Sequence, residues 1–213
     1  MIGIHDPDVV LTDLGLALLG GYFAWRLRHG LGATLMAGLA SAALWGAVFH
    51  GFFPTGTATP AGFVVWLAVA VSILVVAAAL LDMTMLVLGA RLTPGASRGI
   101  TIARPAVIVA YSLTFIAVVL FVDASFATIV WLYAPVLMLA LAAAAFEAAR
   151  TRSRSWALIA AGLGLSALAA LAQRAGVALH ARYFDHNAVY HLIQAAALVV
   201  LYAGFVRRSH DAR

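Results

Sequence analysis

Long apolar stretches alternate with short polar breaks along this chain of 213 residues. A helix needs about 20 mostly apolar residues to cross the hydrocarbon core of a bilayer, and Gly, Pro, Asp or Arg marks each break. The pattern therefore indicates an all-α bundle in one domain over residues 1–213, with almost no soluble part. It predicts seven transmembrane helices, at about 9–27, 31–53, 61–88, 102–122, 125–147, 156–179 and 188–206.

The composition narrows the class of protein further. Apolar residues make up 65% of the chain, charged residues 10%, and the mean hydropathy is +1.04, which excludes a water-soluble domain of this size. No lysine is present, so a seven-helix protein with a retinal Schiff base is excluded. The absence of cysteine excludes disulfides, thiolate metal sites, iron–sulfur clusters and covalently attached haem.

The arginines predict the orientation of the bundle. They lie in short clusters between apolar runs, as membrane topology requires, so the net charge of +5 does not point to nucleic acid. Eleven arginines fall in the odd-numbered loops or the C-terminal segment, and only Arg174 and Arg182 fall on the opposite side. Because arginine-rich loops stay in the cytoplasm, we expect the N-terminus outside and the C-terminus inside, in a bacterial inner membrane.

Polar side chains at membrane depth are costly, and those of this chain gather at the predicted outer side. Asp13 is the most informative acid, because it lies inside the first apolar stretch. A cluster of imidazoles and carboxylates at one end of a bundle has the composition of a metal site. The histidines on that side are His5, His50, His180, His186 and His191, and the acids are Asp6, Asp8, Asp13, Asp123 and Asp185.

Zinc is the metal that this cluster favours. Three neutral imidazoles and a water suit zinc, and we predict that His50, His186 and His191 hold it. His186 precedes His191 by five residues, about 140° around an ideal helix, so the two can share an ion only if His186 precedes regular helix. Otherwise these histidines hydrogen-bond to the backbone and to neighbouring helices at a wet end of the bundle.

Two acids and a stripe of small residues have structural interpretations. We expect Asp82 to pair with Arg91 or another cytoplasmic arginine, or to act in a proton relay, and Glu147 to lie on a solvated face. Small residues at four-residue spacing allow helices to pack closely, or to form a homo-oligomer through those faces. They are Gly38, Ala42 and Gly46 in the second helix and Gly162, Ser166 and Ala170 in the sixth.

Three short segments carry a family resemblance. Phe184-Asp-His-Asn-Ala-Val-Tyr-His-Leu-Ile-Gln194, Phe49-His50-Gly51 and Thr12-Asp13 resemble an uncharacterised family of bacterial seven-helix membrane proteins. More distantly, the layout is similar to the CREST superfamily, which includes alkaline ceramidases and progestin/adiponectin receptors. That resemblance implies a metal-dependent hydrolase of lipid amides or esters, with zinc held by one histidine late in the second helix and two early in the seventh. His50 and His191 match two of these positions, and His186 stands near the third. The chain departs from the pattern in having Gly46 where the superfamily has a serine.

Four functions remain open at this point. The first is a zinc hydrolase of a lipid amide or ester near the outer leaflet, with Asp13 orienting or deprotonating the metal-bound water. Its substrate contacts would be Arg174, Arg182, Tyr190 and Gln194. The second is a non-enzymatic sensor or binding protein with a structural histidine or metal site. The third is a b-type haem protein with His50 and His191 as axial ligands, and the fourth is a transporter. Membrane lipids are the expected partners.

Overall fold

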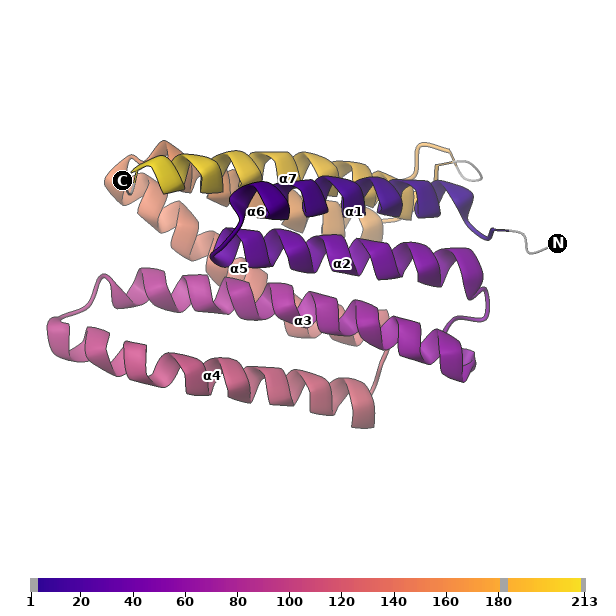
Figure 1. Cartoon of the computed structure of the whole chain (residues 1–213), viewed down its shortest axis with the longest axis horizontal. Helices are drawn as coiled ribbons and strands as arrows, with labels where there is room; N and C mark the ends of the chain where they lie inside the picture. The colour runs from indigo at the N-terminus through magenta and orange to yellow at the C-terminus, as the bar shows by residue number, and fades with distance from the viewer. Residues whose placement is uncertain (1–3, 181–183, 212–213) are drawn as a thin grey trace.

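The computed structural model describes residues 4–180 and 184–211, and these residues form seven long helices (Figure 1). A short 3-10 turn, η1 (Gly56–Ala58), precedes the third helix. The helices are α1 (Pro7–Leu27), α2 (Leu31–Phe52), α3 (Pro60–Gly89), α4 (Pro94–Phe121), α5 (Phe126–Thr151), α6 (Arg154–Arg174) and α7 (His186–Asp211).

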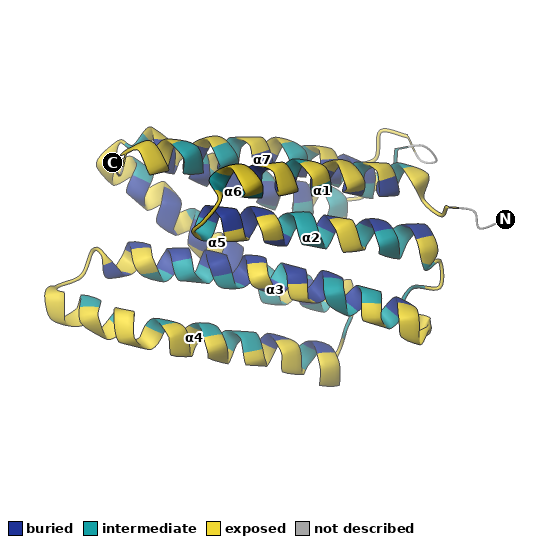
Figure 2. Cartoon of the chain, in the orientation of Figure 1, coloured by how far each residue is buried: buried dark blue, intermediate teal, exposed yellow. Residues whose placement is uncertain are grey.

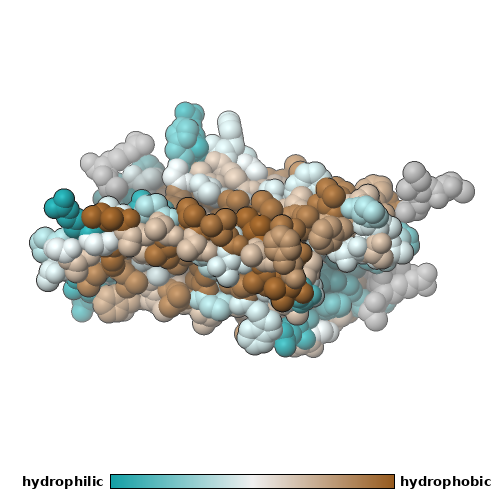
Figure 3. Space-filling view, turned by 90° about the horizontal axis from the view of Figure 1, so that it is seen from below, coloured by the Kyte–Doolittle hydropathy of each residue, from teal (hydrophilic) through white to brown (hydrophobic). Residues whose placement is uncertain are grey.

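The seven predicted spans are confirmed, because each helix is long and apolar enough to cross a membrane. On the face seen in Figure 3, hydrophobic residues cover the central part and hydrophilic ones gather mainly toward the ends. The two chain termini lie at opposite ends of the bundle (Figure 1). The protein is therefore an all-α, multi-pass integral membrane protein.

Several helix boundaries differ from the expected ones, and the start of the fourth helix and the end of the sixth change the loops beside them. The fourth helix begins at Pro94 rather than near residue 102, with Pro105 inside it. Proline suits the first helical turn, whose N–H groups have no partner within the helix, so the expected break after Arg91 is shorter than its charges suggest. The sixth helix ends at Arg174 rather than near residue 179. Gly176 follows with φ +69°, the left-handed conformation that commonly ends helices.

Six of the helices form a closed ring, and α4 lies outside it. Around the ring α1, α2, α3, α5, α6 and α7 pack in that order, and α7 returns to α1. The α4 helix packs mainly against α3, at the edge of the molecule (Figure 1). Only Phe115 and Val119 of α4 are buried, so most of its surface is exposed (Figure 2). The ring arrangement leaves room for a cavity among its six helices.

Small residues bring the ring helices close together. A methyl group at Gly162 of α6 would lie 2.5 Å from Leu201 Cγ of α7, and one at Gly38 of α2 would lie 2.8 Å from a methyl carbon of Val76 in α3. The four-residue spacing is thus used for packing within one chain, as the first of its two interpretations predicts. Association of copies through these faces stays a prediction.

Ion pairs connect helices at the end of the bundle where α3 is followed by α4. Arg91, just after α3, contacts Glu147 of α5 through both carboxylate oxygens, with Arg91 Nε 2.6 Å from Oε1. The expectation of a solvated Glu147 is wrong, because its side chain is only 2% exposed. Burial of a carboxylate requires a partner, and Arg91 supplies it. Asp82 of α3 pairs with Arg104 of α4 at 3.0 Å, which confirms its pairing with a nearby arginine.

Candidate active site in an intramembrane cavity

A cavity of about 560 Å³ lies inside the ring of six helices. Most of its wall is apolar, from side chains that include Leu39, Trp66, Ile73, Ile129, Leu137 and Leu198. The polar side chains that line it come mostly from α1, α2, α6 and the first turns of α7, and they include Asp13, His50, Arg174, His186, Tyr190 and His191. The cavity thus combines a long apolar wall with a polar end, the form that binding sites for small amphiphiles take.

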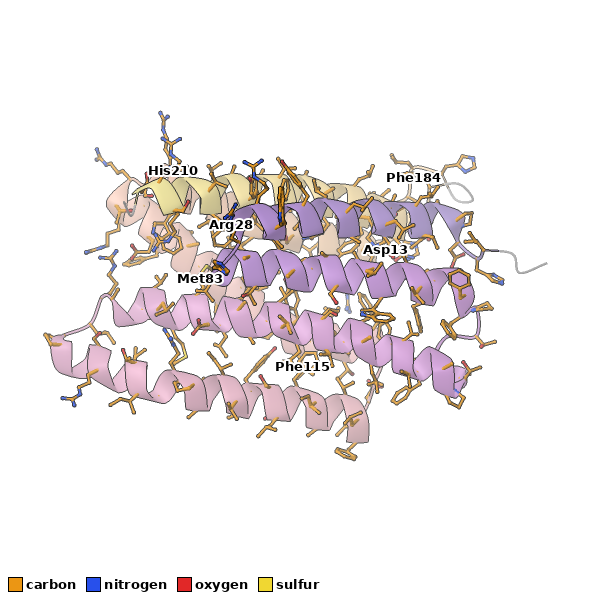
Figure 4. The ribbon with its side chains drawn as sticks, in the orientation of Figure 1. Asp13, Arg28, Met83, Phe115, Phe184 and His210 are labelled. Atoms are coloured by element: carbon orange, nitrogen blue, oxygen red, sulfur yellow. The ribbon has the colours of Figure 1, made fainter. Side chains whose placement is uncertain are left out.

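A buried Asp–His pair is the centre of the polar end. His191 Nε2 of α7 lies 3.1 Å from Asp13 Oδ1 of α1. His191 Nδ1 lies 2.9 Å from the hydroxyl of Thr12, the residue before Asp13. Asp13 is 3% exposed and His191 7% exposed, and Figure 4 places Asp13 in the half of α1 nearer the N-terminus. Two consecutive residues of one helix therefore hold both ring nitrogens of a histidine on another.

The Thr12 hydroxyl can follow the protonation state of this pair. Its oxygen also lies 2.9 Å from Asp8 O and 3.0 Å from Val9 O, so its single proton has alternative acceptors. When Thr12 donates to His191 Nδ1, Nε2–H donates to an ionised Asp13. When Thr12 donates to its own helix, Nδ1–H donates to the hydroxyl, and a proton lies between Nε2 and Asp13. Thr12 can therefore stay hydrogen-bonded to His191 in both protonation states of the Asp13–His191 pair without movement of the ring.

The second carboxylate oxygen of Asp13 is left without a partner. Among the described residues, Asp13 Oδ2 is the one buried side-chain oxygen or nitrogen with no hydrogen bond. It lies against α2 at Gly46, where an added Cβ would be 2.9 Å away. A buried acceptor without a donor is costly, so an unpaired one marks a place where a ligand or water is expected to bind.

The three predicted zinc ligands line the same cavity but are not grouped as a metal site among the described residues. Within residues 4–180 and 184–211, no group of three His, Cys, Asp or Glu side chains is placed to hold a metal ion. His186 opens α7 with its side chain 46% exposed and its Nδ1 3.9 Å from Asp185 Oδ2. Because α7 is already helical at His186, His186 and His191 point about 140° apart. His50 lines the same cavity as His191, with its ring 5.9 Å from that of Phe49.

Hydrogen bonds fix the mouth of the cavity. Asp185 caps α7 by accepting from the backbone N–H groups of Asn187 and Ala188, at 2.8 and 2.9 Å, and its own N–H donates to Asp8 at 3.2 Å. Gln173 of α6 donates to Asn187 at 2.7 Å. Of the predicted substrate contacts here, exposed Arg174 lines the cavity, and Arg182 lies outside the described residues.

The remaining predicted contacts, Tyr190 and Gln194, both line the cavity. Gln194 is buried and donates from Nε2 to Ser166 Oγ of α6 at 3.1 Å. Sequence reasoning did not assign Thr12 or Ser166 to the site. Each becomes relevant through a partner on a distant helix, 179 and 28 residues away along the chain, and no local pattern reports such a pairing.

The fold and the site define a class: a seven-helix membrane protein with an Asp–His pair buried at the polar end of an intramembrane cavity. Within that class, the chain belongs to a family of unknown function, DUF6962, whose match extends over residues 9–210. Among curated proteins and solved structures, none matches the chain.

Proposed function

We propose that this protein is an intramembrane hydrolase that cleaves the amide or ester bond of a lipid held in the cavity. One observation carries the proposal: the Asp13–His191 pair is buried at the polar end of an apolar cavity of about 560 Å³. The apolar wall suits an acyl chain, and the pair suits general acid–base chemistry, which needs a proton acceptor within hydrogen-bond reach of a water.

The proposed reaction uses the pair as its base and then as its acid. The Asp13–His191 pair takes a proton from a water molecule as the water oxygen attacks the lipid carbonyl carbon. The tetrahedral intermediate then expels the amine or alcohol, and the pair returns the proton to that leaving group. The net change is addition of one water across the C–N or C–O bond. Thr12 holds the His191 ring in place and keeps its second nitrogen hydrogen-bonded in both proton states.

Zinc is supported by the types of donor present rather than by their arrangement. Imidazoles from His50 and His191 and the unpaired oxygen of Asp13 are groups that zinc binds, and a bound zinc would polarise the carbonyl. The described residues nevertheless do not group as a three-ligand site, so no step of the proposed reaction uses the metal. Zinc, and the haem alternative with His50 and His191, stay predictions that elemental analysis and a Soret absorption band test directly.

The arginine distribution supports an outer-facing active site in a bacterial inner membrane. Asp13, His50 and His186 lie in the parts of their helices nearest the predicted outer ends. The distant resemblance to the CREST superfamily also supports lipid hydrolysis. Arg174 at the mouth supports an anionic or strongly polar head group as the part of the lipid nearest the surface.

Asp13→Asn tests the proposal most directly. The change keeps the size of the side chain and removes the proton acceptor, so we expect hydrolysis of acylated lipids to fall at least about 100-fold, while binding of the same lipids persists. The measurement is product release by mass spectrometry, with equilibrium binding beside it. Asp123→Asn, at the exposed start of α5, is the matched control and should keep full turnover. Unchanged turnover in Asp13→Asn would reject the catalytic role. Binding without turnover in the unaltered protein would favour the binding-protein alternative.

A further inference from the structure

A second pair of polar side chains, Gln194 and Ser166, lies deeper in the cavity than the Asp13–His191 pair. Gln194 and Ser166 are 5% and 7% exposed, and both line the cavity. Gln194 Nε2 lies 3.1 Å from Ser166 Oγ, and Ser166 Oγ lies 3.2 Å from the carbonyl oxygen of Gly162 in its own helix. The three groups form a short chain of hydrogen bonds that links α7 to α6.

This chain determines which end of the Gln194 amide faces the cavity. A serine hydroxyl has one proton, and here it is donated to Gly162 O. The Ser166 oxygen must then accept from the Gln194 NH₂ group, which turns the amide oxygen Oε1 the other way. Among the described residues, the hydrogen bond of the Gln194 side chain is this one from Nε2, and Oε1 does not belong to their buried unpaired atoms, so a ligand can reach it from the cavity. Gln194, which is only 5% exposed, thus presents its amide oxygen to the cavity as a hydrogen-bond acceptor for a ligand.

The position of Gln194 relates this acceptor to the proposed reaction site. Gln194 follows His191 by three residues, so it lies on the same side of α7, about 4.5 Å further along the helix axis. A lipid whose carbonyl lies at the Asp13–His191 pair would therefore place the atoms next to that carbonyl near Gln194. Apolar Leu198 lines the cavity one turn beyond and would contact the chain that follows.

We propose that Gln194 selects amphiphiles that carry a hydrogen-bond donor beside the carbonyl, and that Ser166 is the positioning residue that holds its acceptor oxygen toward the ligand. The donor is either an amide N–H or a hydroxyl on the adjacent carbon. A ligand without such a donor leaves Oε1 buried and unpaired, and a site built around a hydrogen bond rejects analogues that lack it. This selectivity assumes the lipid position in the proposed function, but it is a property of binding and does not require turnover.

Equilibrium binding of a matched series tests the selectivity. The ligands are N-ethyl dodecanamide, ethyl dodecanoate and the α-hydroxy form of that ester, titrated against the full chain in lipid nanodiscs by calorimetry. The amide carries an N–H donor that the plain ester lacks. The α-hydroxy ester has no N–H but carries a hydroxyl donor on the carbon beside the carbonyl. We expect the unaltered protein to bind at least one donor-bearing ligand about ten- to a hundredfold more tightly than the plain ester. Comparison of the amide with the hydroxy ester identifies which donor the site takes.

Two variants and one control separate selection from folding. Gln194→Met replaces the amide by an apolar chain of similar length and should bring all three dissociation constants within about threefold of one another. Ser166→Ala keeps Oε1 but frees the amide to rotate, and should weaken the preference less. Ser41→Ala breaks a similar serine contact outside the cavity, the 2.8 Å bond to Ser72, and should keep the full preference.

The outcomes distinguish this inference from the proposed hydrolase. Equal affinities in the unaltered protein, no binding of any of the ligands, or a preference that survives Gln194→Met would overturn the selection by Gln194, whatever the turnover experiment shows. A preference that Gln194→Met abolishes would support it even in a protein that hydrolyses nothing.

Discussion

Asp13 combines two roles at the scale of single residues. One of its oxygens contacts His191 at 3.1 Å, and the other lies unpaired against Gly46. A carboxylate at membrane depth has a high free-energy cost, and such groups commonly mark functional sites. Gly46 matters because it lets α2 approach this carboxylate more closely than any other residue type would allow.

Gly46→Ala tests that close approach. Its Cβ would lie 2.9 Å from Asp13 Oδ2, so the carboxylate must shift away from α2. We expect turnover to fall about 10- to 100-fold, because displacements near 1 Å have that effect on positioned catalytic groups. Thermal stability should change little, since the tip of a side chain can move. Gly164→Ala, with no atom within 4 Å of the added methyl, is the control and should keep activity. Full activity in Gly46→Ala would show that the position of the carboxylate is not critical.

Helices α3 and α5 show how connections are stabilised at the scale of elements. The segment that joins α3 to α4 is held to α5 by Arg91 and Glu147, a buried carboxylate paired on both of its oxygens. At the opposite end, α5 begins at a polar cap. Asp123 accepts from the Ser125 N–H at 3.0 Å and from the Ser125 hydroxyl at 2.6 Å, and it also bonds the Thr128 hydroxyl.

Arg91→Ala should lower the free energy of unfolding, because it leaves the Glu147 carboxylate, whose side chain is 2% exposed, without its partner. Adding Glu147→Gln to that variant should restore part of the loss, since the amide carries no charge. Arg104→Ala is the comparison, and we expect about 1 kcal/mol or less there because Asp82 and Arg104 are both partly exposed. The measurement is denaturant unfolding in detergent micelles. Equal losses in the two arginine variants would contradict the burial argument.

The cap at Asp123 should make the start of α5 sensitive to acid. Hydrogen bonds from the Ser125 and Thr128 side chains and from the Ser125 backbone hold the pKa of Asp123 below its ordinary value of 3.8. A carboxyl whose pKa is lower when folded stabilises the fold above its unfolded pKa, and that contribution is lost as the pH falls through its folded pKa. Asp123→Ala should thus lower the melting temperature at pH 7, and the difference from the unaltered protein should shrink as the pH falls below 3.8. A pH-independent difference would contradict the role of the ionised group.

The whole molecule is a ring of six helices with a seventh outside it. The ring encloses the cavity, and every residue proposed here to act on a lipid lines that cavity or holds one that does. Helix α4 contributes nothing to the cavity lining, so changes to its exposed apolar face should leave the site intact. In the proposed reaction, the orientation of the ring in the membrane determines which leaflet supplies the lipid.

Single-cysteine labelling measures that orientation without background, because the chain contains no cysteine. Thr57, exposed between α2 and α3, and Ser209, exposed near the end of α7, lie at opposite ends of the bundle. We expect Thr57→Cys to react with a membrane-impermeant maleimide in intact spheroplasts and Ser209→Cys to react only after lysis. The reverse pattern would place the Asp13–His191 end in the cytoplasm and the lipid supply in the inner leaflet.

The sequence alone determined the properties that depend on local composition. Seven spans follow from apolar stretches separated by charges and prolines, because lipid admits only helices with satisfied backbones or closed barrels. The cost of polar groups at membrane depth also pointed to Asp13 and to the histidines of the predicted outer side. The start of α4 at Pro94 and the burial of Glu147 differ from expectation, because a nearby charge does not by itself mean exposure to solvent.

Only the tertiary structure decided which of these groups meet. Nothing local joins Thr12 to His191 across 179 residues of chain or brings Asp13 to the same ring. Nothing local turns His186 away from His191 at the start of α7 or places α4 outside the ring. Those outcomes depend on how six helices pack around one cavity, and side-chain pairing between helices follows from that packing rather than from any periodicity within a helix.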